Sequence, residues 1–370
     1  MSSWQNLAKP WVKDLSIYEP GKPIEEVARE LGFDDAGGIV KLASNENALG
    51  PSPLAVRAMV AAASDMHLYP DGGAFYLRQA LAKRLRVSPD EILVGNGSNE
   101  ILELVGHVFL GPGTNIVVAD RAFVVYRLVA DAERAETVAV PMRAFTHDLE
   151  AMARAINERT RVVFIANPNN PTGTMVDKRE IHAFMAGIPD HVIVIFDEAY
   201  IELLPEDRQP DVLCYVREGR KCMVLRTFSK TYGLAGLRIG YAVAGRDCID
   251  LLHRVRQPFN VNTMAQIAAL AALDDHEHVM RTRKMVADGL TCLNAGFRAL
   301  GLEAVPSSAN FVLVKVGKGR EVFVAMQRER VIVRPMDGYG LPEYVRVTVG
   351  TQAENEQCLR ALRNVLSRQG

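Results

Sequence analysis

The chain has 370 residues, 48% of them hydrophobic, and its 43 Lys and Arg nearly balance 44 Asp and Glu, for a formal net charge of −1. This balance argues against a nucleic-acid-binding protein, whose affinity depends on clustered basic side chains. The five cysteines form no CxxC pair and no zinc-ligand spacing, so we expect reduced thiols and no metal site. Without a signal-peptide core or a membrane-length apolar run, the expected location is the cytoplasm.

The first 40 residues form an irregular arm, punctuated by Pro10, Pro20 and Pro23, with one short helix expected over 24–31. Such a segment buries little by itself. We therefore expect residues 1–40 to pack against a larger body or against a partner subunit. Residues 41–260 are expected to form a large domain and residues 261–370 a smaller one.

Within 41–260, short apolar runs alternate with stretches long enough for helices. The runs are Glu91–Val94, Asn115–Ala119, Val162–Ala166, Val192–Phe196, Cys222–Leu225 and Ile239–Val243. Continuous β-branched runs of this length are typical of strands buried on both faces of a parallel sheet. The fold class is therefore α/β, with a mainly parallel sheet between helices.

After about residue 262 the pattern changes. A helical region extends to about Leu300, and strands are expected at Phe311–Val316, Val331–Val333 and Tyr344–Val349. The last run alternates strictly, as a half-buried strand does. We therefore predict a small α+β domain at the C-terminus.

Residues able to bind a ligand or take part in chemistry follow five of the apolar runs. They are Gly95–Glu100, Phe123, Asn167–Gly173, Asp197–Tyr200 and Thr227–Lys230. In open α/β sheets, ligands bind in the crevice beyond the carboxyl ends of the strands. These segments are therefore the predicted ligand site.

Each segment also has a plainer interpretation. Gly95–Glu100 is either a tight turn or a helix start that binds phosphate through its N–H groups. Asp197 is either a helix cap or a buried ion-pair partner, since a carboxylate after a buried strand needs a positive group. Lys230 is either solvated or an amine with a lowered pKa that acts as a nucleophile.

The spacing of Asn170–Gly173, Asp197–Tyr200, Ser229–Lys230 and Arg238 resembles the signature of fold-type I pyridoxal-phosphate aminotransferases. Within that group the sequence resembles the histidinol-phosphate aminotransferase family over nearly its whole length. Further matching segments are Tyr18–Pro23, Lys41–Asn47, Leu49–Pro53, Tyr69–Pro70, Val333–Pro335 and Tyr344–Arg346. The resemblance implies a seven-stranded, mainly parallel sheet in the large domain. Ala48 and Arg121–Ala122 depart from the family's usual Pro and Pro-Thr.

The resemblance implies the cofactor pyridoxal 5′-phosphate and roles for residues at the strand ends. Lys230 would bind the cofactor covalently and carry the proton, and Asp197 would pair with its ring nitrogen. Tyr200 and Asn170 would bind its phenolic oxygen, and Phe123 would stack on its ring. The phosphate would be held by Ser98, Asn99, Ser229 and Arg238, and Tyr69 would come from the partner subunit of a homodimer.

For the substrate, the resemblance implies anion recognition by two arginines and closure by a tyrosine. Arg346 lies on the opposite face of its strand from Val345 and Val347, and a planar guanidinium suits bidentate binding of an anion. Arg334 would assist Arg346, and Tyr18 would close over the substrate. Surface ion pairing is the alternative interpretation of both arginines.

The expected reaction converts histidinol phosphate and 2-oxoglutarate to imidazole acetol phosphate and glutamate. Three alternatives remain at this point: an aromatic amino-acid aminotransferase, a pyridoxal-phosphate decarboxylase acting on a phosphorylated amino acid, and a cofactor-binding regulatory domain.

Overall fold

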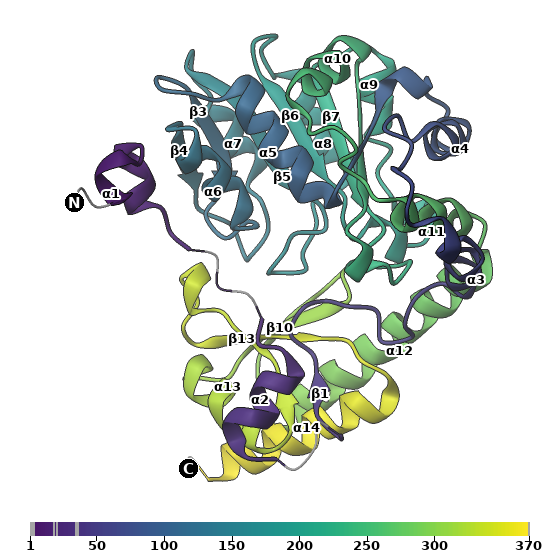
Figure 1. Cartoon of the computed structure of the whole chain (residues 1–370). Coiled ribbons are helices and arrows are strands. Elements are labelled where there is room, and N and C mark those ends of the chain that lie inside the picture. The colour runs from purple at the N-terminus through teal and green to yellow at the C-terminus, as the bar shows by residue number, and fades with distance from the viewer. Residues whose placement is uncertain (1–3, 18, 20, 34–36, 369–370) are drawn as a thin grey trace.

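The computed structural model describes residues 4–17, 19, 21–33 and 37–368, which form two lobes (Figure 1). The larger lobe is built on a seven-stranded sheet of order β2-β8-β7-β6-β5-β3-β4. Its strands are β2 (Ile92–Gly95), β3 (Asn115–Ala119), β4 (Glu136–Val140), β5 (Thr160–Ala166), β6 (Ile193–Asp197), β7 (Cys222–Thr227) and β8 (Gly240–Ala244). β8 pairs antiparallel with β2 and β7, and the remaining neighbours pair parallel. The predicted α/β fold with a mainly parallel sheet is confirmed.

β4 lies outside the predicted strands. It is an edge strand, exposed at Glu136 and Ala139, so it lacks the continuous apolar run of a strand covered on both faces. The other six strands lie where the apolar runs predict them, with ends that differ by at most two residues.

Helices cover both faces of this sheet (Figure 1). α5 (Gly97–Phe109) contacts α6 (Val125–Ala132) and α10 (Arg246–Val255), and α7 (Leu149–Ala155) contacts α8 (Lys178–Ala186). The connection through α6 runs from β3 outward to the edge strand β4, and the connection through α7 runs back from β4 to β5. Since both crossovers between these parallel strands are right-handed, α6 and α7 lie on opposite faces of the sheet. α9 (Leu213–Arg217) contacts β7 and β8.

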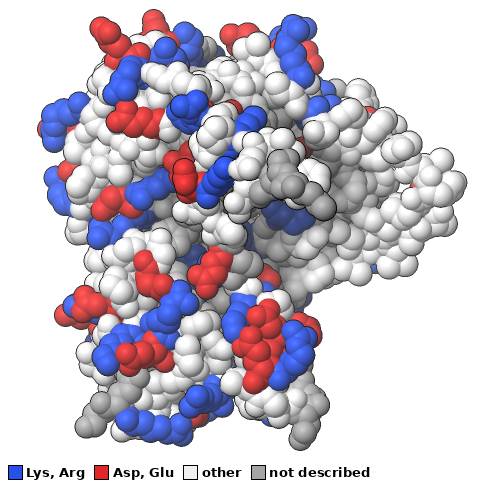
Figure 2. Space-filling view, turned by 60° about the vertical axis from the view of Figure 1, so that its left-hand side comes forward, with Lys and Arg blue, Asp and Glu red and all other residues white. Residues whose placement is uncertain are grey.

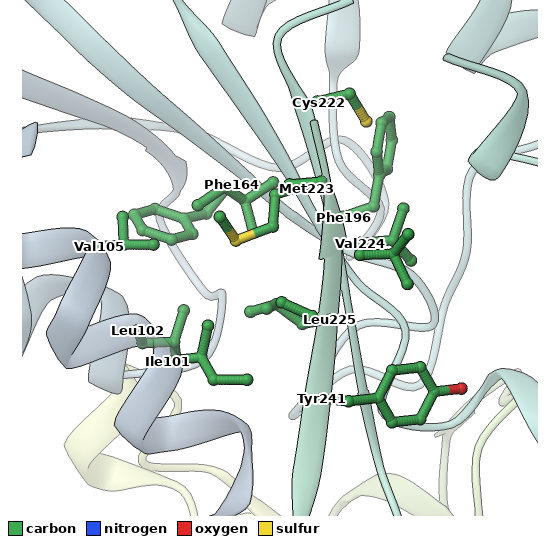
Figure 3. Packing of buried hydrophobic residues seen from close by; sticks show 14 of the residues in the cluster. Ile101, Leu102, Val105, Phe164, Phe196, Cys222, Met223, Val224, Leu225 and Tyr241 are labelled. Atoms are coloured by element: carbon green, nitrogen blue, oxygen red, sulfur yellow. The ribbon is translucent and has the colours of Figure 1, made fainter. Parts of the chain in front are cut away.

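The side chains of β7 alternate between the two faces of the sheet and contribute to the hydrophobic core on both. Figure 3 shows Met223 and Leu225 on the side of α5, near Ile101, whereas Val224 lies on the opposite side. All four residues are fully buried. Because both faces are apolar, the sheet is fixed between two helical layers and its strand ends are held in register.

The smaller lobe is built from both ends of the chain. Its sheet has the order β12-β13-β10-β9, and a separate pair joins β1 to β11. The strands are β1 (Val40–Lys41), β9 (Ala304–Val305), β10 (Phe311–Lys315), β11 (Val331–Ile332), β12 (Arg334–Pro335) and β13 (Tyr344–Thr348). The helices are α2 (Ile24–Leu31), α12 (His276–Ala299), α13 (Gly319–Arg328) and α14 (Gln352–Ser367). α1 (Trp4–Leu7) lies apart from this lobe, on the side of the larger lobe that carries α6 and β4 (Figure 1).

The hydrophobic cores divide the chain differently from the expected boundaries at 40/41 and 260/261. α11 (Thr263–Leu273) packs on α3 (Pro53–Ala62) and α4 (Phe75–Leu85), within the core of the larger lobe. Ile39, Val40, Leu42 and Ala43 belong to the core of the smaller lobe, because β1 pairs with β11. The long helix α12 passes from one core to the other. Chain order alone does not reveal which core an apolar helix face joins.

Charges of both signs are mixed over most of the visible face, whereas the part that projects to the right carries few charged side chains (Figure 2). This local matching agrees with the near-zero net charge. Among residues 4–17, 19, 21–33 and 37–368, none of the helices has the length and apolarity to cross a bilayer. In the same part of the chain, no three His, Cys, Asp or Glu side chains gather as a metal site would require.

One buried ion pair joins the ends of β6 and β7. Glu198, only 1% exposed, accepts from Nε and Nη2 of Arg226 at 2.8 Å each. Burial raises the pKa of Glu198, and the guanidinium opposes this shift. The pair therefore holds the ends of the two strands together, one residue after Asp197 and four residues before Lys230.

Arg226→Met is expected to lower the free energy of unfolding by about 3–5 kcal/mol, because Glu198 would keep a buried charge without its cation. Without the guanidinium, burial would raise the pKa of Glu198 further above its unfolded value, so the loss of stability should be larger near pH ~8 than near pH ~5. Arg154→Met is the control, since Arg154 pairs with Glu150 on the surface, and it should lose less than about 1 kcal/mol. Equal losses in denaturant titrations would contradict the prediction.

Candidate active site

A cavity of about 280 Å³ lies at the carboxyl ends of the large sheet and extends to the smaller lobe. The carboxyl ends of parallel strands meet at one edge, which explains why segments far apart in sequence converge there. The predicted site residues lining it are Ser98, Asn99, Phe123, Asn170, Asp197, Tyr200, Ser229, Lys230, Arg238, Arg334 and Arg346.

Lys230 lies three residues beyond the end of β7, and its Nζ donates to the Ser44 carbonyl at 3.3 Å. The ammonium also lies 5.9 Å from the Tyr200 ring centroid. Burial, and then the nearby Arg346 guanidinium, lower the pKa of Lys230 to about 8. An amine that is partly deprotonated near neutral pH can act as a nucleophile and accept a proton.

The pH dependence of Lys230 reactivity should reveal this shift. Because the pKa is lowered, the reactive amine accumulates as pH rises through about 8 rather than through the ordinary 10.5. We expect modification of Lys230 by a small aldehyde and a reductant to follow that profile, measured by peptide mass spectrometry. Exposed Lys284 in the same digest is the internal reference. A Lys230 midpoint at the ordinary value would contradict the assignment.

Asp197 is the last residue of β6 and is only 6% exposed. Its Oδ2 accepts from the Tyr126 hydroxyl at 2.7 Å, and its Oδ1 accepts from the Ala199 amide at 3.2 Å. Burial raises the pKa of Asp197, whereas these two hydrogen bonds and Lys230 lower it. A buried carboxylate that borders a cavity suits a cationic N–H group of a ligand.

The start of α5 has the geometry of a helix terminus that can bind an anion. Gly97 has a φ of +76°, and a Cβ there would collide with the Arg238 guanidinium. At Gly240, an added Cβ would lie 2.6 Å from the Ser98 amide nitrogen. The two glycines thus let the arginine and β8 approach the helix start, where N–H groups attract anions.

Arg238 donates to Ser229 Oγ and to the Ala235 carbonyl, both at 3.4 Å. Within the described ranges it makes no ion pair with a carboxylate, so its charge remains available to a ligand. Together with Ser98, Ser229 and the α5 start, Arg238 forms a set of donors suited to a phosphate group.

Tyr200 and Asn170 are held by contacts from distant segments. The Tyr200 hydroxyl accepts from Asn45 Nδ2 at 2.9 Å, and burial raises the pKa of Tyr200 to about 12. Asn170 Oδ1 accepts from Arg346 Nη1 at 2.5 Å, and Arg346 Nη2 donates to the Ala43 carbonyl at 2.7 Å. These contacts connect the large sheet to β13 of the smaller lobe.

The remaining predicted site residues lie differently. Arg334 lines the cavity and donates through Nη2 to the Glu19 carbonyl. Tyr18 lies outside the described residues. Tyr69 does not line the cavity of its own chain; it is 83% exposed and stacks on Phe259 with ring centroids 4.8 Å apart. A single chain therefore does not bring Tyr69 to its own site.

Asn45 and Tyr126 are among the cavity-lining residues that escaped prediction from sequence. Asn45 has a φ of +54° and donates to Tyr200, and Tyr126 donates to Asp197. Tyr126 could have been predicted from its spacing, because it comes three residues after Phe123 and residues three apart share one side of a helical turn. Asn45 lies within Lys41–Asn47, a segment that resembles the aminotransferase family, but that resemblance assigned no role to Asn45 itself.

Comparisons with known proteins agree with this geometry. The family described as aminotransferase class I and II matches residues 38–362. A histidinol-phosphate aminotransferase of Akkermansia muciniphila is 51% identical over 98% of this chain and 100% of its own. Histidinol-phosphate aminotransferase 2 of Pseudomonas aeruginosa is 50% identical over 99% of this chain and 100% of its own.

Solved structures are also similar. The crystal structure of histidinol-phosphate aminotransferase from Sinorhizobium meliloti in complex with pyridoxal-5′-phosphate has a TM-score of 0.88 and 27% identity, covering 98% of both chains. A double mutant of Thermus thermophilus aspartate aminotransferase has a TM-score of 0.82 and 25% identity, also over 98% of both chains. The fold is thus shared by enzymes whose names give different amino donors.

Proposed function

The chain belongs to the class I and II aminotransferase family, and on that premise we propose that it transfers the amino group of histidinol phosphate to 2-oxoglutarate. The products are imidazole acetol phosphate and glutamate, a step of histidine biosynthesis. The observation that carries the choice of donor is the 51% identity, over 98% of this chain, to a protein named histidinol-phosphate aminotransferase.

The cofactor of the chain is pyridoxal 5′-phosphate, and the cavity contains groups that fit it. When bound, the cofactor supplies an aldehyde that takes up the amino group and a ring that withdraws electrons from the substrate α-carbon. Asp197 would accept the ring N–H, and Arg238, Ser229 and the α5 start would hold the phosphate. Phe123, which lines the cavity, would cover one face of the ring.

Lys230 would move the proton in the reaction. Its lowered pKa leaves part of the amine unprotonated near neutral pH, so Nζ accepts the proton lost from the α-carbon. Asn170 and Tyr200 would bind the phenolic oxygen of the cofactor. Asn45 and Arg346, which already contact these two side chains, hold them in place.

Arg346 and Arg334 would bind the anionic end of each substrate. Both line the cavity from the smaller lobe, on paired strands in which Arg334 lies opposite Arg346. Two neighbouring guanidinium groups suit a phosphate ester in one half-reaction and a carboxylate in the other, because both anions offer paired acceptor oxygens.

The donor is tested by presenting histidinol phosphate, phenylalanine and tyrosine separately to the cofactor-loaded enzyme with 2-oxoglutarate and measuring glutamate. We expect kcat/KM for histidinol phosphate to exceed that for phenylalanine by about 10- to 100-fold, since a phosphate offers the arginines more charge and more acceptor oxygens than a carboxylate does. The reverse order would favour an aromatic amino-acid aminotransferase. Release of carbon dioxide without glutamate would indicate a decarboxylase.

We also propose that the enzyme is a homodimer with shared active sites. Large apolar side chains of the α3–α4 region are exposed, including Leu68, Tyr69, Phe75 and Tyr76. Exposed apolar patches of this kind mark protein interfaces, and Tyr69 would thereby reach the cavity of the partner. Tyr76→Asp should shift the sedimenting species to a monomer. Val324→Asp on α13, where Val324 is also exposed, is the matched control; a monomeric unmodified enzyme would overturn the proposal.

The five free cysteines fit a reducing compartment, and we infer that the enzyme works in the cytoplasm.

A further inference from the structure

Tyr126 carries a polar group at a position where packing requires only an aromatic ring. It lies in the first turn of α6 and is fully buried. The ring stacks on Phe164 at a centroid distance of 4.5 Å and an interplanar angle of 2°. It meets Phe123 edge-on at 5.7 Å and 87°. These contacts fix the ring in three dimensions, so its hydroxyl has a defined direction.

The hydroxyl points at the carboxylate of Asp197. A buried O–H group needs a hydrogen-bond partner, and the partner here is Asp197 Oδ2 at 2.7 Å. The other carboxylate oxygen accepts from the Ala199 amide at 3.2 Å. Because each oxygen has its own donor, the plane of the carboxylate is fixed at the edge of the cavity.

The donor also favours the charged form of Asp197. Burial raises the pKa of this carboxyl, and the Tyr126 hydrogen bond is the largest of the effects that lower it. The phenol cannot compete for the proton, because burial and the carboxylate raise the pKa of Tyr126 well above its ordinary value. Tyr126 thus remains a donor while Asp197 remains an acceptor.

We propose that Tyr126 is a positioning residue that keeps Asp197 ionised and aimed at the ring N–H of pyridoxal phosphate. The inference depends on the aminotransferase cofactor and not on the identity of the amino donor. It therefore predicts an effect on cofactor binding that is measurable before any substrate is added.

The test compares Tyr126→Phe with Tyr215→Phe in the full-length protein after cofactor removal. Tyr215 is a buried tyrosine of the same hydrophobic core, on α9, and it does not line the cavity. Titration with pyridoxal phosphate should give an approximately 10- to 100-fold higher Kd for Tyr126→Phe, as expected when a hydrogen bond to a charged group is lost. Tyr215→Phe should bind within about twofold of the unmodified protein.

Two further readouts separate positioning from packing. In Tyr126→Phe, Asp197 loses its donor, so cofactor release on acidification should begin at a higher pH than in the unmodified protein. In an Asp197→Asn background, which has no carboxylate to stabilise, adding Tyr126→Phe should change Kd by less than about threefold. An equal loss in both backgrounds, or an unchanged Kd and release profile in Tyr126→Phe alone, would overturn the inference. Neither readout depends on the donor, so a wrong donor assignment leaves this test intact.

Discussion

Lys230→Ala is expected to lower the rate of transamination by about 10⁴-fold or more, because it removes the amine that moves the proton. Among the described residues that line the cavity, Lys230 is the only lysine, so no second amine is in place to do this. The visible absorbance of the covalently bound cofactor should disappear as well. Glutamate formation and the absorbance spectrum of the purified, cofactor-loaded protein are the two measurements.

The matched control for Lys230→Ala is Lys221→Ala. Lys221 immediately precedes β7 at the end of the strand opposite the cavity, and its Nζ donates to the Asp190 carbonyl. This variant should retain activity within about twofold. If Lys230→Ala kept its colour and most of its rate, another amine would be the covalent partner and the proposed mechanism would be wrong.

Asp197→Asn is expected to have the second-largest effect. The substitution keeps the size of the side chain and removes its charge, so the ring N–H of the cofactor would lose an ionic partner in a buried site. The expected rise in the Kd for pyridoxal phosphate is about 10²-fold to a few times 10³-fold, equivalent to the roughly 3–5 kcal/mol lost when one member of a buried charge pair is removed. Titration of the cofactor-free protein measures it.

Asp288→Asn is the control for the loss of a carboxylate. Asp288 lies on the surface of α12, paired with Lys284 at 2.8 Å. Its substitution should leave the Kd for the cofactor unchanged within about twofold. An equally small change in Asp197→Asn would show that this carboxylate does not bind the cofactor.

Much of the fold could be predicted because a strand that is buried on both faces of its sheet appears in the sequence as a continuous apolar run. β3, β5, β6 and β7 are continuous apolar runs, and the polar residues after them had to meet at one edge of a parallel sheet. β4 escaped because an edge strand is partly exposed. The prediction grouped α11 with the C-terminal residues of the smaller domain, whereas α11 packs on α3 in the larger lobe. Its alanine-rich surface fits either core, so only the tertiary packing decides between them.

The sequence by itself determined the composition of the site. It specified a lysine after β7, a carboxylate at the end of β6 and an arginine near a glycine-rich helix start, because each follows an element whose burial is encoded locally. Only the tertiary structure decided which partners hold these groups. Tyr126 and Asp197 are 71 residues apart, Asn45 and Tyr200 are 155 apart, and Asn170 and Arg346 are 176 apart. Hydrogen bonds of this kind arise from how helices and lobes pack together, and no local pattern of apolar and polar residues records that packing.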